Sequence, residues 1–182
     1  MVKGYKNIFW GVFIATFNIN LAFIKILPAF IGWIIVHNGI KILMEEFKTQ
    51  SFEKAIKYSK YLIVLSIIGE FLSLFAGISI NSIVLFSYFP IVTAIIELLM
   101  IFYIIDGSIE YFKEIEEEIY ATQYEINLKT YTIFFVIEII LMCIGLMLNN
   151  ILLTIAVILA IILRISVMVM INNLKKLYIN HI

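Results

Sequence analysis

The sequence predicts an all-α integral membrane helical bundle of six transmembrane helices, paired as three hairpins, with both termini in the cytoplasm. Three observations lead to this prediction. First, 63% of the 182 residues are hydrophobic and only 14% are charged, whereas soluble domains average about 45–50% apolar and about 25% charged residues. Second, the mean hydropathy is +1.07, and long apolar runs recur along the chain. Third, the lysines gather on one side of these runs.

Four apolar runs reach the length of about 20 residues that crosses about 30 Å of hydrocarbon. They are residues 61–80, 83–105, 131–148 and 151–171. Lys25 and Pro28 interrupt the N-terminal stretch, and proline suits the start of a helix after a turn. We therefore expect two further spans, 8–24 and 28–43, within one transmembrane domain covering residues 1–182. A single tilted or re-entrant N-terminal segment is the alternative, and it would reduce the number of crossings.

Lysine placement predicts the orientation, because short cytoplasmic loops retain basic residues. Eleven lysines lie at the termini or beside the two long connections, residues 44–60 and 106–130, and only Lys25 lies at the opposite turns. The eleven are Lys3, Lys6, Lys41, Lys48, Lys54, Lys57, Lys60, Lys113, Lys129, Lys175 and Lys176. Both long connections are therefore expected to be cytoplasmic, in a cell membrane crossed several times.

The second long connection is amphipathic. Ile109, Phe112, Ile115 and Ile119 recur at helical spacing beside a run of glutamates. This pattern predicts that the fourth helix continues into the cytoplasm with an acidic face. Such a face is either solvated or a docking surface for a basic partner.

The second and third hairpins share a sequence pattern at an offset of 68 residues. Glu70 aligns with Glu138, Gly77 with Gly145, Asn81 with Asn149 and Ile83 with Ile151. The two hairpins run in the same direction, so a duplication would be a parallel repeat with its axis along the membrane normal. Convergence at helical turns is the other explanation.

Ionisable and polar side chains inside the spans are the candidate site, because each is costly in lipid unless it is paired or solvated. The candidates are Glu70, Glu97, Glu138, Arg164, Ser66, Ser73, Asn18, Asn20 and His37. Glu97 and Arg164 lie at matching depths of about 22 and 21 Å below the short turns, which predicts an interhelical ion pair. The alternative for Arg164 is a side chain that extends to the cytoplasmic headgroups.

Helical spacing places several of these residues on common faces. Ser66, Glu70 and Ser73 share one face of the third helix, and Pro90, Thr93 and Glu97 share one face of the fourth. Ala156 and Ala160 precede Arg164 on the sixth helix at a spacing that permits close helix contact. These stripes are either hydrogen-bonded packing contacts or the wall of a polar site.

Histidine and the aromatic residues carry weaker signals. His37 has no second histidine one turn away, so we expect a hydrogen-bonded packing residue and no metal or cofactor site. The residues interpreted as anchors at the membrane interface are Trp10, Trp33, Tyr5, Tyr58, Tyr61, Tyr131 and Tyr178.

The first hairpin carries the segment Ile26-Leu27-Pro28-Ala29-Phe30-Ile31-Gly32-Trp33. It resembles a group of small uncharacterised polytopic membrane proteins of Gram-positive bacteria with an I-L-P-x-F-I-G-[WY] segment in the first hairpin. The resemblance implies two spans in this hairpin and a bacterial inner membrane location. The six-span layout also looks like the substrate-binding subunits of energy-coupling factor vitamin transporters: Gly11 and Ala15 match their small-residue face on the first helix, whereas their glycine-rich later spans are missing.

These observations favour a small transport-related protein in which Glu70, Glu97 and Glu138 face a cavity and at least one carboxyl is protonated at neutral pH. Alternatives are a structural or regulatory protein that docks a partner through residues 45–60 and 107–128, or the substrate-binding subunit of a larger transporter.

No motif of a hydrolase, protease or nucleotide-binding enzyme occurs, so we expect no enzymatic activity. Thirteen basic residues balance thirteen acidic ones, which disfavours a nucleic-acid partner. The lipid bilayer is the expected partner, and oligomerisation is left open.

Overall fold

The structure, a computed structural model, describes residues 1–17, 20–21, 24–25, 28–75, 88–148 and 150–180. Within these residues the chain is α-helical apart from one short ribbon, as the sequence predicts. The helices are α1 (Val2–Thr16), α2 (Ala29–Glu46), α3 (Gln50–Phe75), α5 (Phe89–Glu114), α6 (Glu118–Leu148) and α7 (Asn150–Asn180). Strands β1 (Asn20–Leu21) and β2 (Ile24–Lys25) pair antiparallel, with Asn20 opposite Lys25 and Leu21 opposite Ile24.

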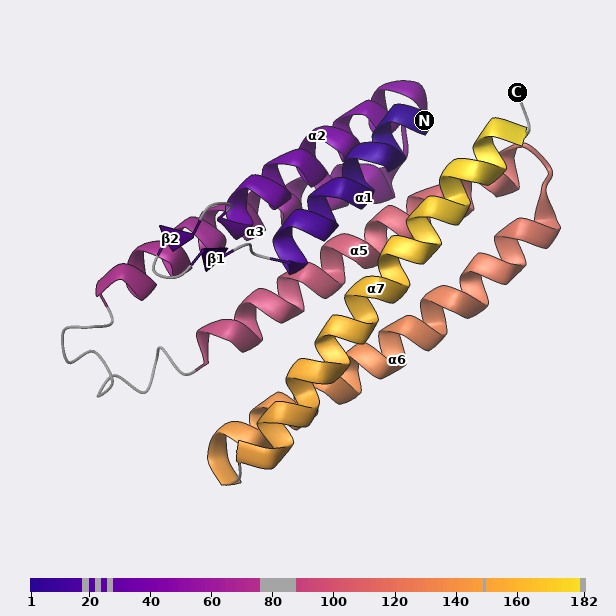
Figure 1. The fold of residues 1–182 in the computed structure, drawn as a ribbon. Coiled ribbons are helices and arrows are strands. Elements are labelled where there is room, and N and C mark those ends of the chain that lie inside the picture. Colours follow the sequence, from indigo (N-terminus) through magenta and orange to yellow (C-terminus); the bar gives the residue numbers. More distant parts are fainter. Residues whose placement is uncertain (18–19, 22–23, 26–27, 76–87, 149, 181–182) are drawn as a thin grey trace.

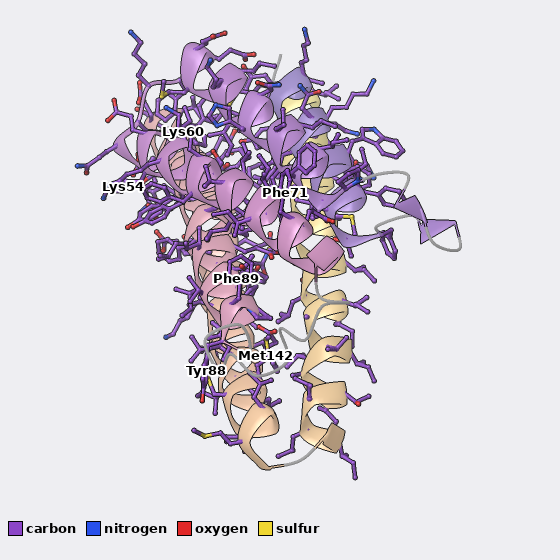
Figure 2. The ribbon with its side chains drawn as sticks, turned by 90° about the vertical axis from the view of Figure 1, so that its left-hand side faces the viewer. Lys54, Lys60, Phe71, Tyr88, Phe89 and Met142 are labelled. Carbon is purple, nitrogen blue, oxygen red and sulfur yellow. The ribbon has the colours of Figure 1, made fainter. Side chains whose placement is uncertain are left out.

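The helices form a closed bundle. Each helix described packs against the next one along the chain, and α7 returns to contact α1. Figure 1 shows the helices running along one common direction, with both termini at the same end of the bundle. The helices that meet at that end carry most of the lysines, and Figure 2 shows Lys54 and Lys60 there, far from Met142. We call it the lysine-rich end.

Three helices, α5, α6 and α7, are long and apolar enough to span a membrane. The sequence predicts six such helices, and among the described residues the structure identifies these three by length and composition. The remaining helices fall short for different reasons. α1 has only 15 residues. α2 has 18 residues, and its last turn contains the charged pair Glu45-Glu46. α3 begins with a lysine-rich segment, and the apolar stretch predicted to follow that segment continues beyond Phe75, outside the described residues.

The helix boundaries also differ from the predicted spans. α1 ends at Thr16 instead of residue 24, and the chain then enters the β1–β2 ribbon. In contrast, α3, α5, α6 and α7 extend well into the segments predicted as cytoplasmic connections. Hydropathy reports the solvent that surrounds a residue, whereas lysine and glutamate support a helix as well as leucine does. Helices therefore do not stop where the apolar run stops.

The predicted acidic extension of α5 is confirmed only as far as Glu114. Ile109 and Phe112 are buried within the bundle, and the helix then ends in a turn at which Glu116 has a φ of 61°. The Glu117 N–H bonds the Phe112 carbonyl oxygen, and the Glu116 N–H bonds the Lys113 carbonyl oxygen. This pair of bonds defines a Schellman motif, which separates α5 from α6 in three residues.

Glycines bring α1 and α2 into backbone contact. A Cβ atom added to Gly11 would lie 2.6 Å from the Gly32 carbonyl oxygen, and one added to Gly39 would lie 2.7 Å from the Gly4 carbonyl oxygen. The glycines are spaced by seven residues on each helix, two turns apart, so they line the facing sides of an antiparallel pair. The N-terminal hairpin is therefore tightly packed, although its helices are short.

Polar contacts close the lysine-rich end. The Met1 amino group pairs with the Glu46 carboxylate, and the Tyr178 hydroxyl lies 3.4 Å from Glu46 Oε2. Thr49 caps α3, because its Oγ1 accepts a hydrogen bond of 3.2 Å from the Ser51 N–H. These contacts join the ends of α1, α2, α3 and α7.

Candidate functional site

Glu97 and Arg164 form a buried ion pair between α5 and α7. Arg164 Nε donates to Glu97 Oε1 at 2.7 Å, and a terminal guanidinium nitrogen donates to Glu97 Oε2 at 2.5 Å. The side chain of Glu97 is 3% exposed and that of Arg164 is 28% exposed. The geometry is bidentate, which is the strong form of a carboxylate–guanidinium contact. The ion pair predicted from matching depths is therefore confirmed, and the Arg164 guanidinium is directed at Glu97.

Trp33 is the third member of this contact. Its ring lies 5.9 Å from the Arg164 Cζ, within the range of a cation–π interaction. Trp33 is 2% exposed, so its interpretation as an interfacial anchor is wrong. Sequence reasoning missed it because tryptophan is ordinarily enriched at the membrane interface. Its helical spacing with Val36 and Ile40, both buried on α2, is the signal that could have found it.

Glu138 is buried beside this pair, but its carboxylate has an oxygen without a hydrogen-bond partner among the described residues. It is 2% exposed, and its Oε2 has no hydrogen-bond partner among the described residues. Tyr131, two turns earlier on α6, is 4% exposed, and its hydroxyl likewise has no partner there. Tyr131 is thus buried, as is Tyr5, which is 2% exposed, so the interpretation of both as interfacial anchors is wrong. Buried polar atoms are usually satisfied, so Glu138 Oε2 and the Tyr131 hydroxyl require an explanation.

A cavity of about 410 Å³ connects the carboxylates. Glu97, Glu138 and Arg164 all line it. The other lining residues come from α1, α5, α6 and α7, and they are Thr16, Pro90, Thr93, Ala94, Met142, Val157, Ala160 and Ile161. Figure 2 shows Met142 and Phe89, the first residue of α5, in the part of the bundle away from Lys54 and Lys60.

Local sequence explains why these side chains meet. Pro90 lies in the first turn of α5, where its missing N–H costs nothing. Thr93 and Glu97 then follow on the same face, as the helical spacing predicts. On α7, Ala156 is fully buried, and Ala160 and Arg164 line the cavity. The small alanine side chains keep the neighbouring helices close while leaving room beside the charged groups.

Glu70 lies elsewhere. Its Oε1 accepts a hydrogen bond of 3.5 Å from the Ala29 N–H, at the first residue of α2. A carboxylate at this place is stabilised by the unpaired N–H groups and the positive end of the helix dipole. Glu70 is not among the residues that line the Glu97–Glu138 cavity. The sequence prediction that all three glutamates face one cavity is therefore corrected to two.

The other predicted site residues are dispersed. His37 Nδ1 is 2.8 Å from the Ser59 Oγ, so His37 is hydrogen-bonded between α2 and α3, as predicted. Ser66 lies partly buried on α3. Asn18 lies outside the described residues, as do the side chains of Asn20 and Ser73. Gly77 and Asn81 of the predicted repeat also lie outside them.

Parts of the two segments predicted as docking surfaces pack within the chain itself, and other parts of both are exposed. Phe52 and Ala55 are fully buried, and the Phe52 ring packs where a Cβ on Gly107 of α5 would lie. The Ser51 hydroxyl lies 2.7 Å from both the Asp106 and the Glu110 carboxylates of α5. The exposed isoleucines of the second segment are Ile115, Ile119 and Ile126, with exposures of 37%, 80% and 61%.

Within the described part of the chain, no group of three His, Cys, Asp or Glu side chains is placed to hold a metal ion. The ionisable groups that line the cavity are the two carboxylates of Glu97 and Glu138 and the guanidinium of Arg164, and most of the remaining wall is apolar. Comparison of the chain with protein-family models, curated proteins and solved structures finds no match.

Proposed function

We propose that the protein is a small membrane transporter or transporter subunit in which Glu138 alternately binds and releases a proton or a cation. One observation carries the proposal: a carboxyl that is 2% exposed, with an unpartnered oxygen, lines a cavity between helices long enough to cross a membrane. An ionisable group in that position is a strong candidate for an ion or proton pathway.

The ion pair gives Glu138 its distinct role. Arg164 already makes a bidentate contact with Glu97, so its charge is balanced within the pair. The formal charge of the three groups is then −1, and it resides on Glu138 unless a proton or a cation neutralises it. The Glu97–Arg164 pair would act as a fixed part of the wall, and Glu138 would act as the exchangeable group.

We further propose that all six helices lie at membrane depth, with the lysine-rich end in the cytoplasm. α3 supports this, because it packs along α5 from the Phe52–Gly107 contact to the Gly69–Phe89 contact. Seventeen residues of α3 separate Phe52 from Gly69, which corresponds to about 26 Å. At the other side of the bundle the Tyr5 hydroxyl of α1 donates to Ser108 of α5 at 2.9 Å. If α5 crosses the bilayer, α1 and α3 therefore lie beside it at the same depth.

The test is proton and solute flux in proteoliposomes containing the intact chain. We expect the wild-type protein to carry a flux that Glu138→Gln abolishes. Glu125→Gln is the matched control, because Glu125 lies on the same helix but is 48% exposed and paired with Lys113. Glu70→Gln should also retain flux, since Glu70 lies outside the cavity. Wild-type flux equal to that of empty liposomes across the whole solute panel would overturn the proposal.

A further inference from the structure

The two threonine hydroxyls that line the cavity act as hydrogen-bond acceptors toward a ligand. The Thr16 hydroxyl donates to the Val12 carbonyl oxygen at 2.7 Å, and the Thr93 hydroxyl donates to the Phe89 carbonyl oxygen at 3.0 Å. A hydroxyl has only one proton to donate. Both threonines therefore offer the cavity only the lone pairs of their oxygens.

Glu138 adds a third acceptor that carries charge. Its Oε2 has no partner among the described residues, and only 2% of the residue is exposed. Arg164 is the one lining residue with a cationic group; two of its five N–H groups are directed at Glu97, whose carboxylate balances its charge, and the other three remain donors on that side of the cavity. The charge left unbalanced among the lining residues is thus that of Glu138, with the two threonine oxygens as neutral acceptors.

The remaining wall is apolar, and this decides which cation fits. Pro90, Ala94, Met142, Val157 and Ile161 contribute no polar side-chain atom. A bare metal cation needs about six or more oxygen ligands to replace its hydration shell, and these walls do not supply them. A volume of about 410 Å³ lies within the range of small-molecule sites, about 300–1,000 Å³.

We propose that the cavity binds a small organic ammonium ion, with its N–H groups directed at Glu138 and its hydrocarbon body against the apolar wall. This inference rests on the proposed function and names its substrate class. A charge-assisted hydrogen bond to the Glu138 carboxylate supplies the affinity, and the apolar wall supplies the preference for an organic cation over an inorganic one.

Trp33 provides a readout that does not depend on transport. Its ring lies against Arg164, which lines the cavity, and Trp10 is the other of the two tryptophans in the chain. Trp10 is 48% exposed, so Trp10→Phe leaves Trp33 as the sole reporter. The protein in lipid nanodiscs is titrated with hexylammonium, and separately with hexan-1-ol and hexanoate, which have the same hydrocarbon body without the positive charge.

We expect a saturable change in Trp33 fluorescence with hexylammonium and affinities at least about tenfold weaker for hexan-1-ol and hexanoate. Glu138→Gln should weaken hexylammonium binding by about tenfold or more, whereas Glu125→Gln should not change it. Circular dichroism confirms that both variants fold. Thr93→Val, which removes one acceptor and keeps the shape, should weaken binding by a smaller factor.

Equal response to the three probes, or hexylammonium binding unaffected by Glu138→Gln, would overturn the ammonium site. The binding experiment tests the substrate class, and the flux experiment tests the proposed transport function, so one proposal can fail while the other stands. Proton flux that depends on Glu138 without hexylammonium binding overturns the substrate class and leaves the proposed function standing. Glu138-dependent hexylammonium binding without any flux supports the site and overturns transport.

Discussion

Arg164 engages both oxygens of the Glu97 carboxylate, at 2.7 and 2.5 Å, from the middle of α7 to the middle of α5. These helices are joined in sequence through α6, and the pair connects them across the bundle at the wall of the cavity. The contact is therefore both a structural link and the element that leaves Glu138 as the unbalanced charge.

Removal of one partner of this pair should be strongly destabilising. Arg164→Met leaves the Glu97 carboxylate, which is 3% exposed, without its counter-charge, and the expected loss is about 3–5 kcal/mol of unfolding free energy. The double variant Glu97→Met with Arg164→Met should recover most of that loss, because two apolar side chains need no partner. Denaturant unfolding in bicelles measures both. A single variant as stable as the wild type would show that the pair is solvated.

The α1–α2 contact gives a second prediction. Gly11→Ala should cost about 1–3 kcal/mol, since the new Cβ would lie 2.6 Å from the Gly32 carbonyl oxygen and 2.7 Å from the Val36 nitrogen. Both atoms are backbone, so the helices must separate. Thermal unfolding in detergent measures the loss.

Gly69→Ala is the matched control for this substitution. Its nearest neighbour is the Phe89 ring at 3.0 Å, a side chain that can adjust, and alanine favours a helix by about 0.5–1 kcal/mol over glycine. The control should therefore be close to neutral. Similar losses at both positions would contradict the backbone contact between α1 and α2.

The turn between α5 and α6 predicts a gain in stability. Glu116 adopts a φ of 61°, a left-handed conformation that costs an L-residue about 1–2 kcal/mol and costs glycine almost nothing. Glu116→Gly should therefore raise the unfolding free energy by up to about 1 kcal/mol, once the extra chain entropy of glycine is deducted. Glu117→Gly removes the same charge at the next position, which has no positive φ, and should give no gain. Unfolding in detergent at high salt compares the two without a charge effect.

The sequence predicts the parts of this molecule that depend on periodicity and depth. The all-α class, the Glu97–Arg164 pair and the stripe of Pro90, Thr93 and Glu97 all follow from helical spacing, and the structure contains each of them. Spacing within a helix is a local property, and matching depths reduce the choice of partners on other helices.

The sequence does not predict which faces meet across the bundle. Glu70 and Glu138 occupy equivalent places in the apparent repeat, yet Glu70 contacts the start of α2 and Glu138 lines the cavity. The packing of α2 against α3, and of α5 and α7 around α6, determines this difference. For the same reason, the burial of Trp33 is not predicted, because it depends on a contact between α2 and α7 through Arg164.

The membrane topology gives the final prediction, and it bears on the count of spanning helices. Lys25→Cys, Asn81→Cys and Asn149→Cys, each in a Cys143→Ala background, place single thiols at the three short connections that the sequence predicts on the side opposite the cytoplasmic lysines. An impermeant maleimide should label all three from outside intact cells, because eleven lysines favour retention of the other end in the cytoplasm. Lys54→Cys and Glu117→Cys should label only after permeabilisation.

The position of Lys25 makes this experiment decisive for the first hairpin. α1 and α2 are short, but the Tyr5–Ser108 bond and the Trp33–Arg164 contact hold them against α5 and α7. Helices held along a membrane-spanning neighbour should bring the β1–β2 ribbon to the outer surface, and Lys25 should then label as fast as Asn81. If Lys25 alone stays unlabelled while the other two outer sites react, the hairpin is re-entrant, and the six-span arrangement is wrong.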